Sequence, residues 1–332
     1  MEIIDAHVHL YPPEINRDPA VWAAARGEPH WALLCTRTRK NGRPVQTFPD
    51  LASLLRAMDA ADVSRAILQG WYWENPETCA MQNRFYAQCV RSHPDRLGAC
   101  AAIHPRAGIA GAREEIRRAA GDGFVGLGEL SPHSQGISAD DPALHEVFAL
   151  AGELGLAVNL HVTEFAGASG AAGVAGVAGA AGVAGATGAR NYPGKVATPP
   201  DDFAGWARAH PRTRFVLAHW GGRLPLVTGA ADAEPGAAGE SARGAENIFY
   251  DTAASPLIYG AGSAGVWREM VAAAGAERVL FGTDFPLVLY PKTETEPSMA
   301  SLAAEARASG LGGRELAAVF AGNAKRVYSP GL

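Results

Sequence analysis

Short apolar runs alternate with longer amphipathic segments along the chain, and this alternation restricts the fold more than any other feature. Apolar runs that rarely alternate in polarity are typical of strands buried on both faces of a parallel sheet. Eight such runs are strand candidates: Ile3–Val8, Arg65–Gln69, Leu97–Ile103, Phe124–Glu129, Leu156–His161, Thr213–His219, Asn247–Asp251 and Arg278–Asp284. Helical spacing of apolar residues marks Asp50–Ala61, Ile109–Ala120, Asp141–Leu154 and Asp201–His210.

Eight strands alternating with helices predict an α/β protein with the (β/α)8 TIM-barrel fold. The length of 332 residues fits one such barrel, so residues 1–332 are expected to form a single domain. A doubly wound open sheet is the alternative fold. It is disfavoured because no G-x-G-x-x-G sequence follows the first strand.

Composition excludes several classes of protein. With 48% hydrophobic and 19% charged residues, the chain can bury a core and is not globally disordered. Its net charge of -5 argues against nucleic acid or an acidic membrane surface as the main partner. The four cysteines form no C-x-x-C pair, and no basic region precedes an apolar one at the N-terminus, so we expect a cytoplasmic protein without a signal peptide.

Two long segments interrupt the alternation. Residues 11–46, after the first strand, are predicted to form a long irregular loop over the active-site face. Residues 165–190, after the fifth strand, consist almost wholly of Ala, Gly and Val. This stretch is long enough to cross a bilayer, but glycine is too frequent and Leu and Ile are absent. We therefore predict a low-complexity insert in a surface loop, either a flexible lid or an inert insertion.

The residues at the strand ends carry the chemistry. The first strand ends in His7-Val8-His9, and alternation sends both imidazoles to the same side, where they can bind one ion. Four later strands end in a residue that can bind metal or transfer protons, namely Glu129, His161, His219 and Asp284. Because a barrel gathers the C-terminal ends of its strands around one mouth, these side chains are predicted to form one site.

Imidazole and carboxylate ligands suit a divalent metal ion. Zinc is the first expectation, and manganese, iron, cobalt and nickel fit the same donors. Such an ion lowers the pKa of its bound water to about 7. Asp284 can take a proton from that water, and His219, where it is not a ligand, can polarise a carbonyl or move a proton. Asp284 and His219 are therefore the predicted catalytic residues.

Several motifs resemble those of a known superfamily. D-A-H-V-H-L at 5–10, L-H-V at 160–162, A-H-W-G-G at 218–222 and F-G-T-D-F-P at 281–286 are similar to motifs of the amidohydrolase superfamily. The chain most resembles the branch that contains aminocarboxymuconate-semialdehyde decarboxylase and related lactone and amide hydrolases. The closing A-G-N-A-K-R-V-Y at 321–328 resembles the last helix of that branch.

The resemblance implies one metal ion held by His7, His9, His161 and Asp284, with His219 beside it as a catalytic residue. It also implies either hydrolysis of a C–N or C–O bond or non-oxidative decarboxylation. A homodimer is an expectation from the family alone.

One motif departs from the decarboxylase pattern. G-L-G-E-L at 126–130 places Glu129 at the end of the fourth strand, which resembles TatD-type nucleases and other two-metal members in which a glutamate bridges the ions. In that arrangement His7, His9 and Asp284 hold one ion, while His161 and His219 hold the other. Alternatively, Glu129 only hydrogen-bonds a ligand histidine. This difference from the decarboxylase pattern favours hydrolysis. It leaves open whether the site binds one metal ion or two.

Further residues are candidates for substrate binding because they follow the strand ends or the insert: Glu164, Tyr192, Lys195, Trp220 and His104. Lys195 belongs to N-Y-P-G-K and could meet a substrate anion, although a solvated loop lysine is the alternative. Trp220 could form a wall of the pocket, although packing beneath the loop is the simpler role.

We therefore predict a metal-dependent hydrolase that acts on an amide, lactone or ester of a small molecule. The first alternative is a non-oxidative decarboxylase of an aromatic or enoic acid that uses one metal ion. The second alternative is a non-catalytic, metal-containing binding subunit.

Overall fold

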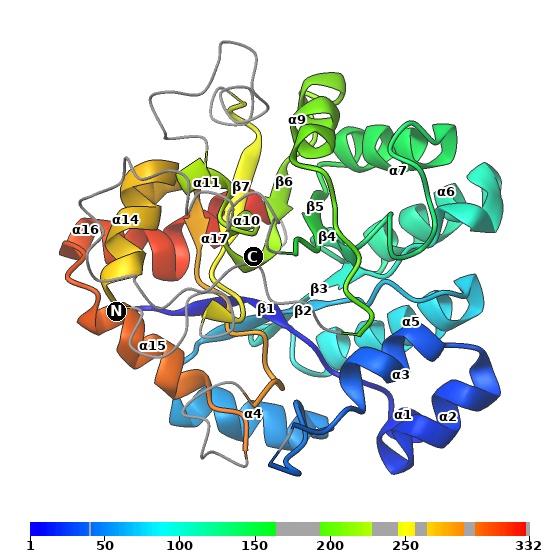
Figure 1. The fold of residues 1–332 in the computed structure, drawn as a ribbon, viewed down its shortest axis with the longest axis horizontal. Helices are drawn as coiled ribbons and strands as arrows, with labels where there is room; N and C mark the ends of the chain where they lie inside the picture. The colour runs from blue at the N-terminus through cyan, green and yellow to red at the C-terminus, as the bar shows by residue number, and fades with distance from the viewer. Residues whose placement is uncertain (40, 164–192, 228–244, 256–263, 289–295, 330–332) are drawn as a thin grey trace.

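Eight parallel strands follow one another around a sheet in chain order, and helices lie outside them (Figure 1). The computed structural model describes residues 1–39, 41–163, 193–227, 245–255, 264–288 and 296–329. The strands are β1 (Ile4–Val8), β2 (Arg65–Gln69), β3 (Leu97–Ala101), β4 (Gly126–Leu130), β5 (Ala157–Leu160), β6 (Phe215–Leu217), β7 (Ile248–Asp251) and β8 (Val279–Leu280). The prediction of a (β/α)8 TIM barrel is confirmed.

Hydrogen bonds between β1 and the segment from β8 onward close the barrel. The Ala6 amide donates to the Phe281 carbonyl at 2.8 Å, and the Asp284 amide donates to the His7 carbonyl at 2.9 Å. Val8 and Phe285 continue this seam as a parallel bridge. The seam therefore fixes the residues after β8 beside the end of β1.

Helices surround the strands, and many of them begin at a proline, whose fixed φ suits the first turn of a helix. The helices after β1, β2, β3 and β4 are α1 (Pro13–Arg17), α2 (Pro19–Arg26), α3 (Pro29–Cys35), α4 (Leu51–Ala60), α5 (Pro76–Ser92), η1 (Pro105–Ala107), α6 (Gly108–Gly121) and α7 (Pro142–Glu153). Those after β5 are α9 (Pro200–Ala209), α10 (Ala218–Gly221), α11 (Leu224–Val227), α14 (Ala264–Ala274), η3 (Ala276–Arg278), α15 (Met299–Ala308), α16 (Gly313–Ala317), η4 (Ala318–Gly322) and α17 (Asn323–Val327).

Residues 11–46 are more ordered than the predicted irregular loop. They contain α1, α2 and α3, each of which begins at a proline. Trp31 of α3 is buried in a cluster with Tyr11 and Trp73, so this segment packs against the loop after β2. The helices are too short for their apolar spacing to stand out in the sequence, and the prediction of an irregular loop was wrong for this reason.

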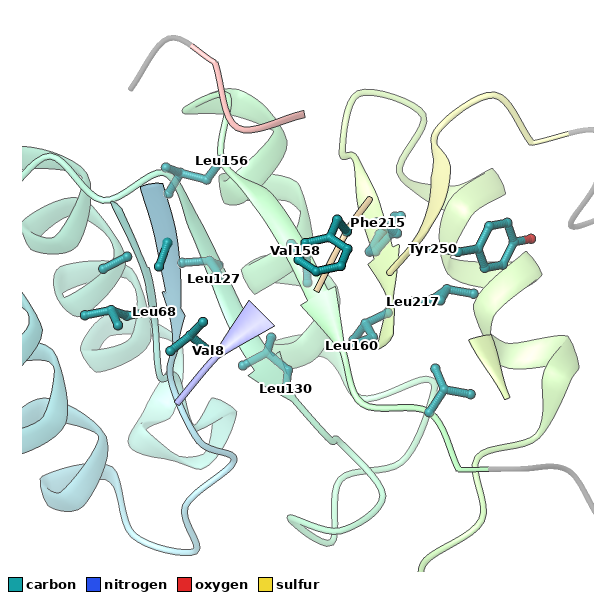
Figure 2. Packing of buried hydrophobic residues seen from close by; sticks show 14 of the residues in the cluster. Val8, Leu68, Leu127, Leu130, Leu156, Val158, Leu160, Phe215, Leu217 and Tyr250 are labelled. Carbon is teal, nitrogen blue, oxygen red and sulfur yellow. The ribbon is translucent and has the colours of Figure 1, made fainter. Parts of the chain in front are cut away.

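The barrel has an inner and an outer apolar layer. The inner cluster takes residues from or beside every strand, and Tyr328 with α17 completes it. Figure 2 shows members of the outer cluster, among them Val158 and Leu160 of β5. Alternation along β5 therefore directs Ala157, Asn159 and the following His161 inward, which gives an apolar base and a polar upper layer.

The predicted insert, residues 165–190, lies outside the described residues. Its flanks are close together, because the Thr163 hydroxyl donates to the Val196 carbonyl at 3.3 Å. Within the ranges given above, no helix has the length and apolar character needed to cross a membrane.

Candidate metal centre

Six side chains that could bind a metal ion meet at the C-terminal ends of the strands. They fall into two sets, and the ligand atoms within each set lie within 4.8 Å of one another. We call His7, His9 and Asp284 the first donor set, and Glu129, His161 and His219 the second donor set. All are buried except His161, which is partly exposed. The structure thus places the six predicted donors in one region.

The imidazoles of the first donor set face each other in a way that suits a cation. His7 Nε2 lies 3.1 Å from His9 Nε2. The other ring nitrogens are oriented as donors: His7 Nδ1–H donates to Asp251 Oδ2 at 2.9 Å, and His9 Nδ1–H donates to the Gln69 carbonyl at 3.0 Å. When both rings are neutral, as metal ligands are, the two Nε2 lone pairs point toward each other, which a shared cation relieves. These donors therefore fit a divalent metal ion.

Glu129 lies between the two donor sets. Its Oε2 is 3.7 Å from His9 Nε2 and 3.9 Å from His7 Nε2. Its Oε1 is 2.9 Å from His161 Nδ1 and 3.3 Å from His219 Nε2. Two ligands of a tetrahedral ion, each bound at about 2.1 Å, lie roughly 3.4 Å apart. The separations are close to that value, so one carboxylate can reach both sets.

A close approach between β4 and β5 positions Glu129. The register of the two strands shifts between Leu127 and Leu130, as at a β-bulge. Gly128 precedes Glu129 with φ +131, and a Cβ there would lie 2.6 Å from the Asn159 carbonyl oxygen. Only glycine fits this position without displacement of β5, which explains the second glycine of G-L-G-E-L.

Gly128→Ala is expected to destabilise the metal-free protein by about 2–5 kcal/mol, through backbone strain and the new contact with β5. Gly155→Ala is the matched control, because Gly155 also has a positive φ, +70, yet nothing lies within 4 Å of its added Cβ. Backbone strain alone gives the control a cost of about 1–2 kcal/mol. Urea unfolding of both variants measures these losses, and equal losses would contradict the role of the close contact.

Left-handed turns present two further donors. Asp284 has φ +64 and lies within the seam with β1. His219 has φ +58 and lies in the turn α10, beyond the last residue of β6. The predicted strand Thr213–His219 is therefore too long at its C-terminal end. The turn keeps His219 at the mouth, and its amide donates to Asp251 Oδ1 at 3.0 Å.

For His7 and Glu129, attraction to oppositely charged neighbours shifts the pKa more than burial does. Burial by itself would lower the pKa of His7, but the carboxylates of Asp251, Glu129 and Asp284 raise it to about 10. Burial would raise the pKa of Glu129, but His161 and His7 hold it well below its usual range. In the metal-free protein, Glu129 is therefore ionised at neutral pH, as a metal ligand must be.

Burial and the neighbouring His7 act together on His9 and lower its pKa to about 4. His9 is therefore neutral near pH 7, with Nδ1–H bound to the Gln69 carbonyl at 3.0 Å. A neutral imidazole with one nitrogen fixed as a donor leaves the other as a metal ligand.

Three residues at the centre were not among the predicted site residues. Asp251 ends β7 and binds the His7 ring, and the strand-end reasoning that selected the other donors would have selected it too. Trp71 and Tyr72 follow β2 after Gly70, and their rings lie 5.4 Å from the His9 ring and 5.0 Å from the His161 ring, respectively. They form an aromatic wall beside both donor sets.

The other predicted substrate-binding residues are placed as follows. Glu164 and Tyr192 lie outside the described residues. Lys195 is partly buried next to Gly194, whose carbonyl accepts from His30 Nε2 at 2.8 Å.

Trp220 and His104 lie in other surroundings. Trp220 is fully buried, and its indole donates to Ser255 Oγ at 2.7 Å and packs against Trp267. His104 lines a cavity of about 230 Å³ between α5 and α6, together with Cys79 and Glu115. None of the six donors lines this cavity.

The barrel and its two convergent donor sets define a protein of the (β/α)8 class with donors suited to a divalent metal ion at its mouth. The amidohydrolase family model matches residues 4–329, so the chain belongs to the amidohydrolase family. No curated protein matches the chain.

Solved structures share the fold at low sequence identity. The 5-carboxyvanillate decarboxylase of Sphingomonas paucimobilis is 20% identical with a TM-score of 0.64, and the match covers 98% of each chain. A dihydroxybenzoic acid decarboxylase of Polaromonas sp. JS666, with bound manganese and an inhibitor, is 18% identical with a TM-score of 0.63, over 98% of this chain and 96% of that one. A probable 2-pyrone-4,6-dicarboxylic acid hydrolase of Acinetobacter baumannii is 14% identical with a TM-score of 0.59, over 99% of each chain. At these identities the likeness shows the fold alone.

Proposed function

We propose that the protein is a metal-dependent hydrolase that cleaves a C–N or C–O bond of a small molecule, such as an amide, a lactone or an ester. The position of Glu129 carries this proposal. Its two oxygens face different donor sets, at 2.9–3.9 Å from four imidazole nitrogens. A carboxylate shared in this way is suited to a pair of ions that act on one water and one substrate.

In this proposal, His7, His9 and Asp284 would hold one ion, His161 and His219 would hold the other, and Glu129 would serve both. A divalent ion at these donors supplies Lewis acidity and lowers the pKa of a bound water to about 7. Zinc is the first candidate. Manganese, iron, cobalt and nickel suit the same donors, and the manganese in the Polaromonas neighbour makes that ion the second to try.

The chain's own residues position the reacting groups and move the proton. Asp284 Oδ2 lies 3.8 Å from His219 Nδ1, on the side of the carboxylate away from His9. The Asp284 carboxylate can accept a proton from the attacking water and return it to the leaving group. With only one ion bound, His219 would instead donate to the carbonyl oxygen of the substrate. Trp71 and Tyr72 would exclude water from one side of the site.

Non-oxidative decarboxylation of an aromatic or enoic acid is the second candidate. His161 Nδ1 and Glu129 Oε1 are 2.9 Å apart, which also suits a direct hydrogen bond with no ion between them. In that case one ion would bind to His7, His9, His161 and Asp284. Two of the structural neighbours named above are decarboxylases, which favours including this reaction in the test.

The experiment that separates the two reactions uses zinc-loaded and manganese-loaded protein in ¹⁸O-labelled water. One panel contains p-nitrophenyl esters, anilides and lactones, and the other contains aromatic and enoic acids. We expect products of the first panel to carry one ¹⁸O atom from water. Release of carbon dioxide from the second panel, without turnover of the first, would contradict the hydrolase proposal and establish decarboxylation.

A further inference from the structure

We propose that Asp251 is a positioning residue that holds one member of each donor set in place. Its Oδ2 accepts from His7 Nδ1–H at 2.9 Å, and its Oδ1 accepts from the His219 amide at 3.0 Å. His7 belongs to the first donor set and His219 to the second. One carboxylate at the end of β7 thus connects both halves of the metal centre.

Each hydrogen-bond partner of the Asp251 carboxylate among the described residues donates to it. Besides His7 and His219, Asn159 Nδ2 donates to Oδ2 at 3.0 Å and the Ala253 amide donates to Oδ1 at 3.1 Å. Each carboxylate oxygen therefore accepts two hydrogen bonds. Asp251 is fully buried, so water cannot replace any of these bonds.

The arrangement determines which nitrogen of His7 is available to a metal ion. With Nδ1–H bound to Asp251, Nε2 is directed toward His9 Nε2 at 3.1 Å and Asp284 Oδ1 at 3.9 Å. A carboxylate behind a ligand histidine fixes the orientation of the ring and increases its basicity. Asp251 should therefore act on the affinity for metal without contacting the ion.

The contact with His219 acts on the backbone. His219 has φ +58, a conformation that a residue with a side chain seldom adopts without support. The hydrogen bond from its amide to Asp251 provides that support and places its Nε2 3.3 Å from Glu129 Oε1. Loss of Asp251 should therefore loosen both donor sets together.

Asp5 offers a matched control. It is also a fully buried carboxylate, and it contacts the backbone of His7 rather than its ring, at 3.1 Å. The Thr283 amide donates to Asp5 Oδ1, the oxygen that also accepts from the His7 amide, and the Thr283 hydroxyl donates to Asp5 Oδ2. In Asp5→Asn the amide oxygen keeps both backbone donors, and the new NH2 can donate to the threonine oxygen.

Asp251→Asn cannot be accommodated in this way. Whichever way the amide is turned, its NH2 faces two donors and loses two hydrogen bonds. We expect the affinity for zinc, measured by competition with a chromogenic chelator, to fall about 10–100-fold in Asp251→Asn. In Asp5→Asn it should stay within about threefold of the wild type. Equal affinities of Asp251→Asn and wild type, or equal losses in the two variants, would overturn the inference.

A measurement on the unmodified protein covers the case in which Asp251→Asn does not fold. In zinc-loaded protein labelled with ¹⁵N-histidine, we expect His7 Nδ1 to carry a slowly exchanging proton, assigned with His7→Gln. A His7 Nδ1 without a proton would refute the role of Asp251. The inference rests on the metal centre of the proposed function, but its readout is metal binding and not turnover. Wild-type protein that binds neither zinc nor manganese would refute the proposed function itself.

Discussion

Asp284→Asn is expected to lower kcat/KM for the hydrolysed substrate by about 10²–10⁴-fold, the usual contribution of a positioned general base. The substitution keeps the size of the side chain, so the left-handed turn and the seam with β1 should persist. It removes the charge and the oxygen that takes the proton, because an amide is not basic enough for this role. Asp284 Oδ1 lies 3.5 Å from His9 Nε2 of the first donor set, so the affinity for metal should also decrease in Asp284→Asn.

Asp202→Asn provides the control for this prediction. Asp202 also pairs with a histidine, His133, at 2.8 Å, but it lies on α9 outside both donor sets. Steady-state kinetics at saturating metal, with metal content measured in the same samples, should show Asp202→Asn close to wild type. If Asp284→Asn retained both its metal and its activity, the catalytic assignment would be wrong.

Glu129→Gln is expected to reduce the metal content of the protein from two ions per chain to one or none. The carboxylate is ionised, because His161 and His7 outweigh burial and hold its pKa well below the usual range. Glutamine removes that charge, and its NH2 must face the nitrogens of one donor set. Loss of a carboxylate behind a ligand already costs 10–100-fold in affinity, so loss of a shared ligand should cost about 100-fold or more.

Elemental analysis of protein purified without a chelator or a histidine tag measures this change. Glu115→Gln is the matched control, since Glu115 is a partly buried glutamate of α6 that accepts from Asn83 and Arg84. It should keep two ions. One ion in the wild type, unchanged in Glu129→Gln, would instead support His7, His9, His161 and Asp284 as the whole ligand set and would favour decarboxylation. No metal, even after reconstitution, would refute the catalytic proposal.

The sequence was sufficient to predict the barrel and the convergence of the donors because both depend on topology. Parallel strands in a closed barrel bring their C-terminal ends together whatever the details of the side chains. His161, for example, needs only to follow β5 on its inward face to reach the mouth. The same reasoning applies to Asp251, which ends β7 and was overlooked.

Other features depend on contacts between distant segments. The need for glycine at 128 comes from the Asn159 carbonyl on β5, and the turn at His219 is supported by Asp251 on β7. Neither contact has a signal within its own segment of sequence. The helix α5 was not among the predicted helices because its buried face contains polar residues. Gln82, for instance, is fully buried and accepts from the Trp71 amide, so the helix shows no continuous apolar stripe.

The seam between β1 and the segment after β8 has a consequence for how the protein acquires its metal. His7 and His9 come before almost the whole barrel in the chain, whereas Asp284 follows it, so the two histidines are synthesised well before the carboxylate. The first donor set is incomplete until the last strand has paired with the first, as in the bond from the Asp284 amide to the His7 carbonyl. A nascent chain that has not yet reached β8 therefore presents two histidines without their carboxylate. Tight metal binding at the first donor set would therefore require the finished barrel, whereas the second donor set lies wholly within residues that precede β8.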